Sequence, residues 1–128
     1  MAIAITKRFL GGSSYGRGLI VSATQGATLN TVHTCTTSST ATIDEVYLYA
    51  QNNWSAGVEL VLEWGGSQTI TCMVPSREGP TLVIPGMLFA GSGTDVTINA
   101  WLNTTASLVT SGSGLFTVHG WVNRMVQS

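Results

Sequence analysis

The chain has 128 residues, of which 9% are charged and 44% are hydrophobic, and its formal net charge is -1. An ordinary soluble domain has about 25% charged residues, so this surface is poor in charge and suits packing against other subunits, where charged groups would lose their water. The small net charge argues against a surface that binds polyanions such as nucleic acid, and the length fits one domain with its own core.

Residues 1–17 differ in composition from the rest and are predicted to form an N-terminal arm. The apolar run precedes the basic residues, which is not the order of a secretory signal, and we expect synthesis in a reducing cytoplasm. The arm would pair with a neighbouring subunit by strand addition or by docking Phe9 and Leu10. A simple edge strand or a frayed tail is the alternative. The segment holds three of the five basic residues beside three large apolar or aromatic ones: Lys7, Arg8, Arg17, Phe9, Leu10 and Tyr15.

Residues 18–128 are predicted to form one all-β domain, a β-sandwich of about eight antiparallel strands. Apolar and polar residues alternate in almost every segment, and no stretch has the 3.6-residue period of a helix. Turn sequences such as Gly65-Gly66 separate the segments. The spacing favours a jelly roll, with an up-and-down barrel as the alternative. The expected strands cover roughly 18–24, 29–36, 43–51, 57–64, 67–74, 81–90, 94–102 and 114–126.

The alternation also places aromatic side chains. Trp64 is in phase with the apolar positions of residues 58–62, which predicts a core position, whereas Trp101 and Trp121 are out of phase with the apolar positions of their strands. Exposed aromatic residues in a chain with so little charge are typical of subunit contacts. We therefore predict these interaction residues: Lys7, Arg8, Phe9, Leu10, Tyr47, Tyr49, Trp101 and Trp121.

Residues that could carry out catalysis are present at unfavourable spacings. Asp44 and Glu45 are adjacent, so they point to opposite faces of a strand. Glu59 and Glu63 share a face but lie about 13 Å apart, beyond the roughly 5–9.5 Å of paired glycosidase carboxylates. We expect the acidic residues at outward strand positions or in turns, and we predict no enzyme activity and no cofactor.

The histidines and cysteines do not form a recognisable metal motif. His33 and Cys35 share a strand face and could begin a zinc site, but no third ligand stands at a usual spacing. Cys72 alternates in phase with Ile70 and Val74, which predicts a small buried side chain. A disulfide between Cys35 and Cys72 is conceivable, although no disulfide framework supports it. We predict no metal site.

Four segments resemble a recurrent class of small virion proteins of tailed bacteriophages. The resemblance extends over most of the chain beyond residue 17. It implies a structural component with a compact β-sandwich that attaches to the capsid shell. Proteins of this class commonly act as cement or decoration proteins, as trimers where capsomers meet, and the class has no catalytic motif. The four segments are residues 44–50 (DEVYLYA), 62–66 (LEWGG), 82–86 (LVIPG) and 119–124 (HGWVNR).

These observations lead to one main hypothesis and two alternatives. The main hypothesis is a non-enzymatic capsid decoration or cement protein in the virion, which forms a homo-oligomer, with a trimer favoured, and bridges subunits of the major capsid protein. No direct nucleic-acid or membrane partner is expected. The first alternative is a tail, neck or baseplate component. The second is a carbohydrate-binding module for host recognition, with tryptophans as the sugar-stacking platform.

Overall fold

The computed structural model describes residues 3–11, 16–21, 31–35, 42–64, 68–90, 96–103 and 115–127. No helix that could span a membrane occurs within these ranges. Their regular elements are all strands: β1 (Ile3–Phe9), β2 (Leu19–Ile20), β3 (Thr31–Cys35), β4 (Thr42–Asn52), β5 (Val58–Trp64), β6 (Gln68–Val74), β7 (Thr81–Ala90), β8 (Val96–Asn103) and β9 (Phe116–Gln127).

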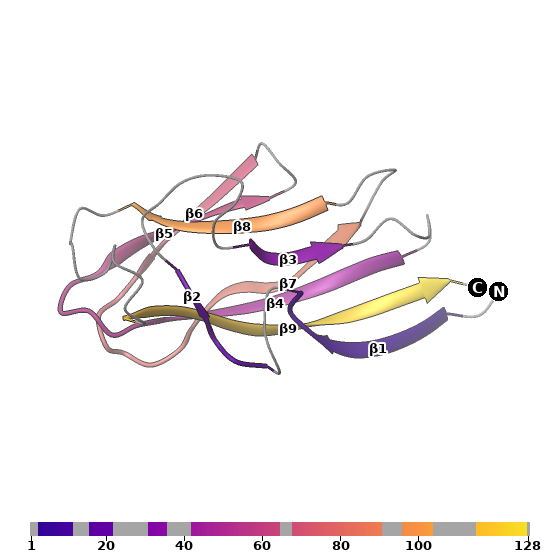
Figure 1. Ribbon diagram of the computed structural model, residues 1–128, viewed down its shortest axis with the longest axis horizontal. Coiled ribbons are helices and arrows are strands. Elements are labelled where there is room, and N and C mark those ends of the chain that lie inside the picture. Colours follow the sequence, from indigo (N-terminus) through magenta and orange to yellow (C-terminus); the bar gives the residue numbers. More distant parts are fainter. Residues whose placement is uncertain are drawn as a thin grey trace.

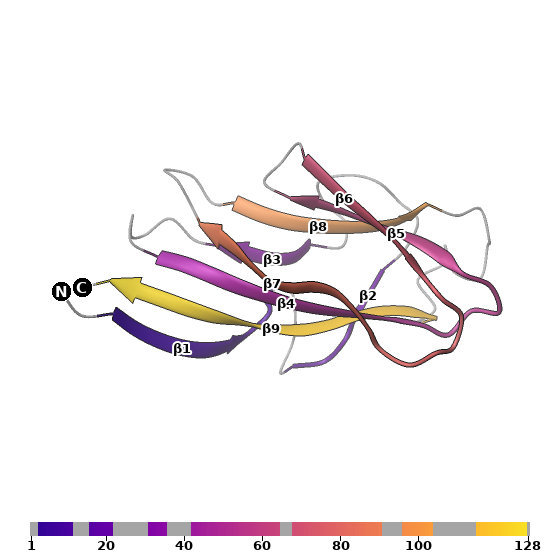
Figure 2. The same cartoon turned by 180° about the vertical axis from the view of Figure 1, so that it is seen from behind.

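The strands form two antiparallel sheets that pack face to face (Figure 1). Sheet 1 has the order β1-β9-β4-β7, with the short β2 also pairing with β9, and sheet 2 has the order β3-β8-β5-β6. Figure 2 shows the same two layers from behind, with β1 at the open edge of sheet 1. The predicted all-β sandwich is confirmed.

The strand pairs nest inside one another along the chain. β5 pairs with β6, β4 with β7, β3 with β8, and both β1 and β2 with β9. A jelly roll has this nested arrangement, because its two Greek keys wind one long antiparallel ribbon across two sheets. We therefore keep the jelly roll as our interpretation. The up-and-down barrel is wrong, because β5 and β6 are the only consecutive strands that pair among the described elements.

The N-terminal segment belongs to the sandwich in this chain. Residues 3–9 form β1, which pairs with residues 121–127 of β9 without a break in register. Residue 17 therefore does not separate an arm from the domain, and the edge strand named as the alternative describes this segment better. Whether β1 also pairs with a neighbouring subunit stays a prediction.

The core follows the alternation that the sequence displays. Along β4, Val46, Leu48 and Ala50 are fully buried, and the residues between them face outward. Trp64, predicted to be core, is half-buried at the margin and packs edge-on against Phe89, with ring centroids 4.8 Å apart. Burial of branched side chains from both sheets thus holds the layers together.

No disulfide joins the two cysteines. Cys35 is buried on β3 and Cys72 is half-buried on β6, and these strands form opposite edges of sheet 2. Burial and the nearby Glu59 carboxylate raise the pKa of the Cys72 thiol. Cys72 therefore behaves as the small, largely apolar side chain that its phase predicts, although it is less buried than expected.

Candidate functional site

Three aromatic side chains form a cluster on the outer face of sheet 1. Trp121 of β9 lies directly opposite Tyr47 of β4. Their rings stack with centroids 5.0 Å apart and an interplanar angle of 13°. Tyr49 stacks on Trp121 as well, at 5.9 Å and 25°. The strand phase thus correctly predicted that Tyr47, Tyr49 and Trp121 face away from the core, and strand pairing joins them into one aromatic cluster.

Polar neighbours hold the aromatic cluster in place. The Tyr47 hydroxyl donates a hydrogen bond to Glu45 Oε1 over 3.0 Å, and Asn123 Nδ2 donates to the same oxygen over 3.0 Å. The hydrogen bond to Glu45 raises the pKa of Tyr47. Lys7 Nζ lies 5.6 Å from the centroid of the Trp121 ring, within range of a cation–π contact. Contacts within the chain therefore order these side chains.

Large apolar side chains surround the aromatic cluster on the same face. Ile5 is 66% exposed, and Phe9 and Leu88 are each 62% exposed. Phe9 pairs with Trp121, and Leu88 pairs with Glu45, so both point to the outer side of sheet 1. Single exposed apolar residues are ordinary, but several on one sheet face, beside an aromatic cluster, are typical of an interaction surface.

Three of the predicted interaction residues do not belong to this surface. Arg8 pairs with the buried Val122, so it stands on the inward side of β1 and not on the outer face of sheet 1. Leu10 is 2% exposed and lies in the chain's own core, so the prediction that it docks into a neighbour is wrong. Trp101 pairs with Val61 on sheet 2, and its neighbours Ala100 and Leu102 point inward. Trp101 is therefore on an outer face, as predicted, but on the opposite one from Trp121.

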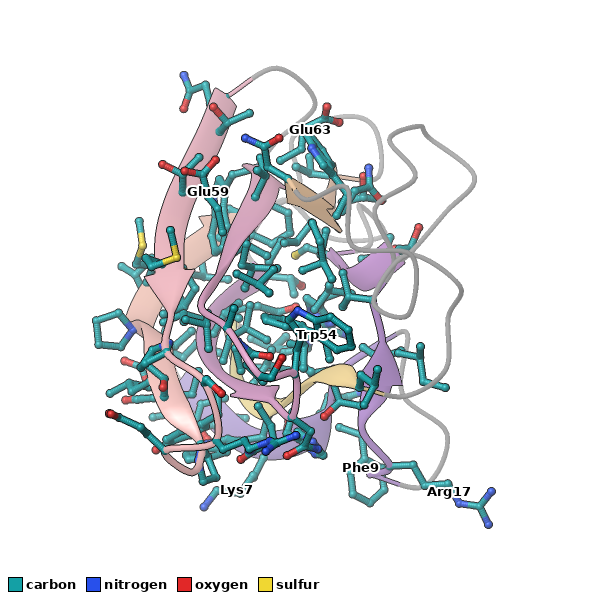
Figure 3. The ribbon with its side chains drawn as sticks, turned by 90° about the vertical axis from the view of Figure 1, so that its left-hand side faces the viewer. Lys7, Phe9, Arg17, Trp54, Glu59 and Glu63 are labelled. Carbon is teal, nitrogen blue, oxygen red and sulfur yellow. The ribbon has the colours of Figure 1, made fainter. Side chains whose placement is uncertain are left out.

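The acidic residues of sheet 2 lie on that opposite side. Figure 3 shows Glu59 and Glu63 on one side of the sandwich and Lys7 and Phe9 on the other. Glu59 accepts a hydrogen bond of 2.9 Å from Asn103 Nδ2. Glu59 and Glu63 therefore occupy the outward strand positions that were expected.

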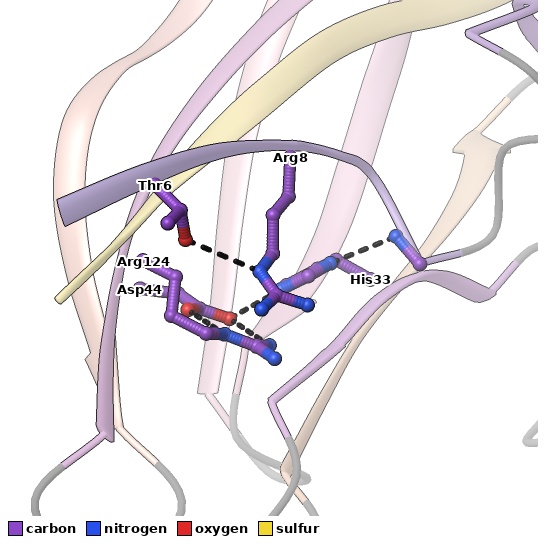
Figure 4. Close-up of polar contacts among 6 residues, drawn as sticks. Thr6, Arg8, His33, Asp44 and Arg124 are labelled. Atoms are coloured by element: carbon purple, nitrogen blue, oxygen red, sulfur yellow. Dashed lines mark hydrogen bonds and ion pairs between the residues drawn. The ribbon is translucent and has the colours of Figure 1, made fainter. Parts of the chain in front are cut away.

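Asp44 contradicts the expectation that the acidic residues face outward. Its side chain is fully buried between the sheets, and both of its oxygens accept hydrogen bonds from Arg124, at 2.8 Å from Nε and 2.9 Å from Nη2. His33 Nε2 lies 2.7 Å from Asp44 Oδ2 (Figure 4). Burial raises the pKa of Asp44, but the hydrogen bonds from Arg124 and His33 and the Arg124 charge hold it well below its usual range.

The contacts of His33 define its protonation state in this network. The Gly11 backbone N–H donates to His33 Nδ1 over 2.9 Å, so Nδ1 must keep a lone pair. The ring proton is then on Nε2, which donates to Asp44, and the imidazole is neutral. Asp44 and Arg124 therefore balance each other in charge, and His33 ties the end of β1 to β3.

Sequence reasoning missed this network, although a signal for it exists. Asp44 has the phase of the buried positions of β4, and Arg124 has the phase of Val122 on β9. Two opposite charges at inward phases indicate a buried ion pair. His33 turns inward at an irregularity of register between Thr31 and His33 on β3, which periodicity does not reveal.

The described residues include all of the histidines and cysteines of the chain. Among them, no group of three or more His, Cys, Asp or Glu side chains is placed to hold a metal ion. His33, one half of the zinc site considered above, is engaged by Asp44 and Gly11. No protein-family model, curated protein or solved structure was found to match this chain.

Proposed function

We propose that this chain is a structural subunit of a tailed-bacteriophage particle, a capsid decoration or cement protein that binds the major capsid protein. The observation that carries the proposal is the outer face of sheet 1, where Ile5, Phe9 and Leu88 are each more than 60% exposed beside the aromatic cluster. In water such a face costs free energy, at roughly 25 cal/mol for each Å² of apolar surface. Contact with a partner removes that cost.

The composition supports a role in assembly. Only 9% of the residues are charged, so little desolvation of charge opposes the burial of this face. A weak contact repeated over a shell gives a strong total attachment, because each subunit then resists displacement together with its neighbours. The proposal includes a homo-oligomer, with a trimer favoured, and bridging of neighbouring capsid subunits against the pressure of packaged DNA.

A pair of matched variants tests the face. Leu88→Glu places a charge on the outer face of sheet 1, and Met73→Glu places one on sheet 2 at a residue of nearly the same exposure, 63% against 62%. With shells that lack this protein, we expect Leu88→Glu to reduce binding at least tenfold and Met73→Glu to leave it unchanged. Equal binding by both variants, with unchanged melting temperatures, would contradict the use of this face.

The location in the particle has its own test. We expect electron microscopy of virions to place the protein on the shell, and the copy number to be comparable with that of the major capsid protein. Density confined to the tail would instead support the tail, neck or baseplate alternative. So would a number of copies per virion that is only enough for a single ring. Absence from virions would overturn both.

A second candidate function is carbohydrate binding. A hollow of about 450 Å³ lies beside the aromatic cluster and is lined by Tyr49, Gln51, His119 and Trp121, among others. Sugar rings stack on aromatic faces, and an amide can bind their hydroxyls. Binding on a glycan array that disappears with Trp121→Ala and persists with Trp101→Ala would favour this function. A blank array would remove it.

A further inference from the structure

β1 lies at an edge of sheet 1 with both of its faces open. Among the described elements it pairs with β9 alone, so its other edge faces away from the sheet (Figure 2). Every residue from Ala4 to Phe9 is exposed, on the inward side of the strand as well as on the outer one. Alternate residues of an edge strand direct their N–H and C=O groups away from the sheet, where another strand can pair with them.

The backbone of β1 lacks the irregularities that protect many edge strands. Such strands are commonly blocked by a proline, a bulge or a very short length. β1 has 7 residues, no proline and an unbroken register with β9. At the other edge of sheet 1, β7 contains Pro85, and its register with β4 shifts at two places. Of these two edges, the β1 edge is therefore the one that an extended segment can follow.

Two basic side chains give the β1 edge a positive charge on both faces. Lys7 pairs with Asn123 and points to the outer side, whereas Arg8 pairs with the buried Val122 and points to the inward side. Within the described ranges, no carboxylate lies within ion-pair distance of either side chain. β6, the regular edge strand of sheet 2, has no charged residue. A strand that carries negative charge would therefore favour β1 over β6.

A second copy of this chain does not supply that negative charge. The strands at the sheet edges, β1, β3, β6 and β7, contain no Asp or Glu. Pairing of β1 with the β1 of another copy would also bring basic side chains together, and like charges on neighbouring strands destabilise their pairing. The charge of this edge therefore points to a different protein as the partner.

We propose that the edge of β1 binds an extended acidic segment of another protein, which adds to sheet 1 as an antiparallel strand. Adjacent residues of a strand point to opposite faces, so two consecutive acidic residues can reach Arg8 on one face and Lys7 on the other. Apolar residues of the segment would lie against Phe9 and Ile5, which are 62% and 66% exposed on the outer face. Opposite residues 9 to 5, the segment then reads apolar, acidic, acidic, polar, apolar. This proposal does not depend on the capsid role.

The test uses the whole purified chain and three peptides with blocked ends. The acidic peptide, VEETVTV, has the proposed pattern, and the basic peptide, VKKTVTV, reverses its charge. The third peptide is the acidic one with N-methyl groups on two adjacent residues, so that one blocked nitrogen must face β1. We expect the acidic peptide to bind with a dissociation constant of about 0.1 mM. The other two should bind at least tenfold more weakly, and added salt should weaken binding of the acidic peptide.

Hydrogen exchange locates the added strand. Saturating acidic peptide should slow the exchange of alternate amides of β1 at least tenfold, because those N–H groups gain a carbonyl partner. The amides of β6 and β7 should keep their exchange rates. Slowing at β6 or β7 in place of β1 would overturn the proposal. So would a free protein that self-associates and already protects alternate amides of β1, because a second copy would then occupy the edge.

Variants assign the charges. The double variant Lys7→Glu/Arg8→Glu should prefer the basic peptide at least tenfold, whereas Arg77→Gln, at an exposed arginine in the turn between β6 and β7, should leave the acidic peptide's affinity unchanged. If the double variant melts at a lower temperature, Lys7→Glu alone, on the outer side, should still weaken the acidic peptide at least threefold. Undetectable binding at about 1 mM, equal binding of the acidic and basic peptides, full binding of the N-methyl peptide, or full binding by Lys7→Glu would overturn the proposal.

Discussion

Asp44 of β4 lies directly opposite Arg124 of β9, and the Arg124 guanidinium holds both oxygens of the buried Asp44 carboxylate. Removing one member of a buried pair leaves the other charge without a partner. We expect Asp44→Ala to lower the free energy of unfolding by about 3–5 kcal/mol, as measured by urea denaturation. Glu78→Ala, at an exposed turn residue, should change it by less than about 0.5 kcal/mol. Equal effects of the two variants would contradict this account.

The same pair should make the protein sensitive to acid. The pKa of Asp44 is held well below its usual range in the folded protein, and it is about 3.9 in an unfolded chain. Above that value the carboxylate is ionised in both states and its contribution is complete. As the pH falls from about 4 to about 2, the unfolded chain binds the proton first, so stability is lost. Asp44→Asn should show a shallower decline in this window, by up to about 1.4 kcal/mol per pH unit; an unchanged slope would count against the pair.

The fold was predictable because its signal is local, whereas the buried network depends on pairing between distant strands. Val46, Leu48 and Ala50 alternate with polar neighbours, and this alone indicates a strand with one buried face. Asp44 and Arg124 are 80 residues apart, so their contact exists only once β4 pairs with β9. Strand phase alone correctly predicted that Trp121 faces away from the core. It does not indicate to which of the two sheets a strand belongs, because that depends on how distant strands pair.

Phe9 and Leu10 are neighbours in sequence with opposite environments. Leu10 is 2% exposed in the core, whereas Phe9 is 62% exposed on the outer face of sheet 1. We expect Leu10→Ala to lower the free energy of unfolding by about 2–5 kcal/mol, because it leaves a cavity. Phe9→Ala should cost less than about 1 kcal/mol. If chemical denaturation shows both to be nearly neutral, this end of β1 does not pack on the sandwich.

Tyr47 and Glu45 are coupled on the outer face of sheet 1. The Tyr47 hydroxyl donates to Glu45, and ionisation of the phenol would lose that bond and add repulsion, which raises the pKa of Tyr47. We expect Glu45→Gln to lower this pKa. Ultraviolet titration can follow the change, since the chain has 3 tyrosines. Replacing both Tyr15 and Tyr49 by Phe in the same background leaves Tyr47 as the one tyrosine that titrates. A Tyr47 pKa that does not move would show that Glu45 is not its partner.

Gly120 of β9 lies close against the backbone of β4. It pairs with Leu48, and a Cβ at this position would clash with the Tyr47 carbonyl oxygen and lie 3.2 Å from Leu48 Cα. These are backbone atoms of a central strand, so relief requires the two strands to separate, which would also displace Tyr47 from Trp121. We expect Gly120→Ala to cost at least about 3 kcal/mol, measured by denaturation, and to weaken the near-ultraviolet circular dichroism of the aromatic stack.

Gly57→Ala is the matched control for that variant. A Cβ at Gly57 would meet only ordinary contacts, the nearest being Met73 Sδ at 3.4 Å. Because alanine restricts the unfolded chain more than glycine does, this variant should be neutral or more stable by up to about 1 kcal/mol. Similar losses at both glycines would mean that the cost arises from the backbone in general. A loss confined to Gly120 would identify the β4–β9 contact as the one that fixes the position of the aromatic cluster.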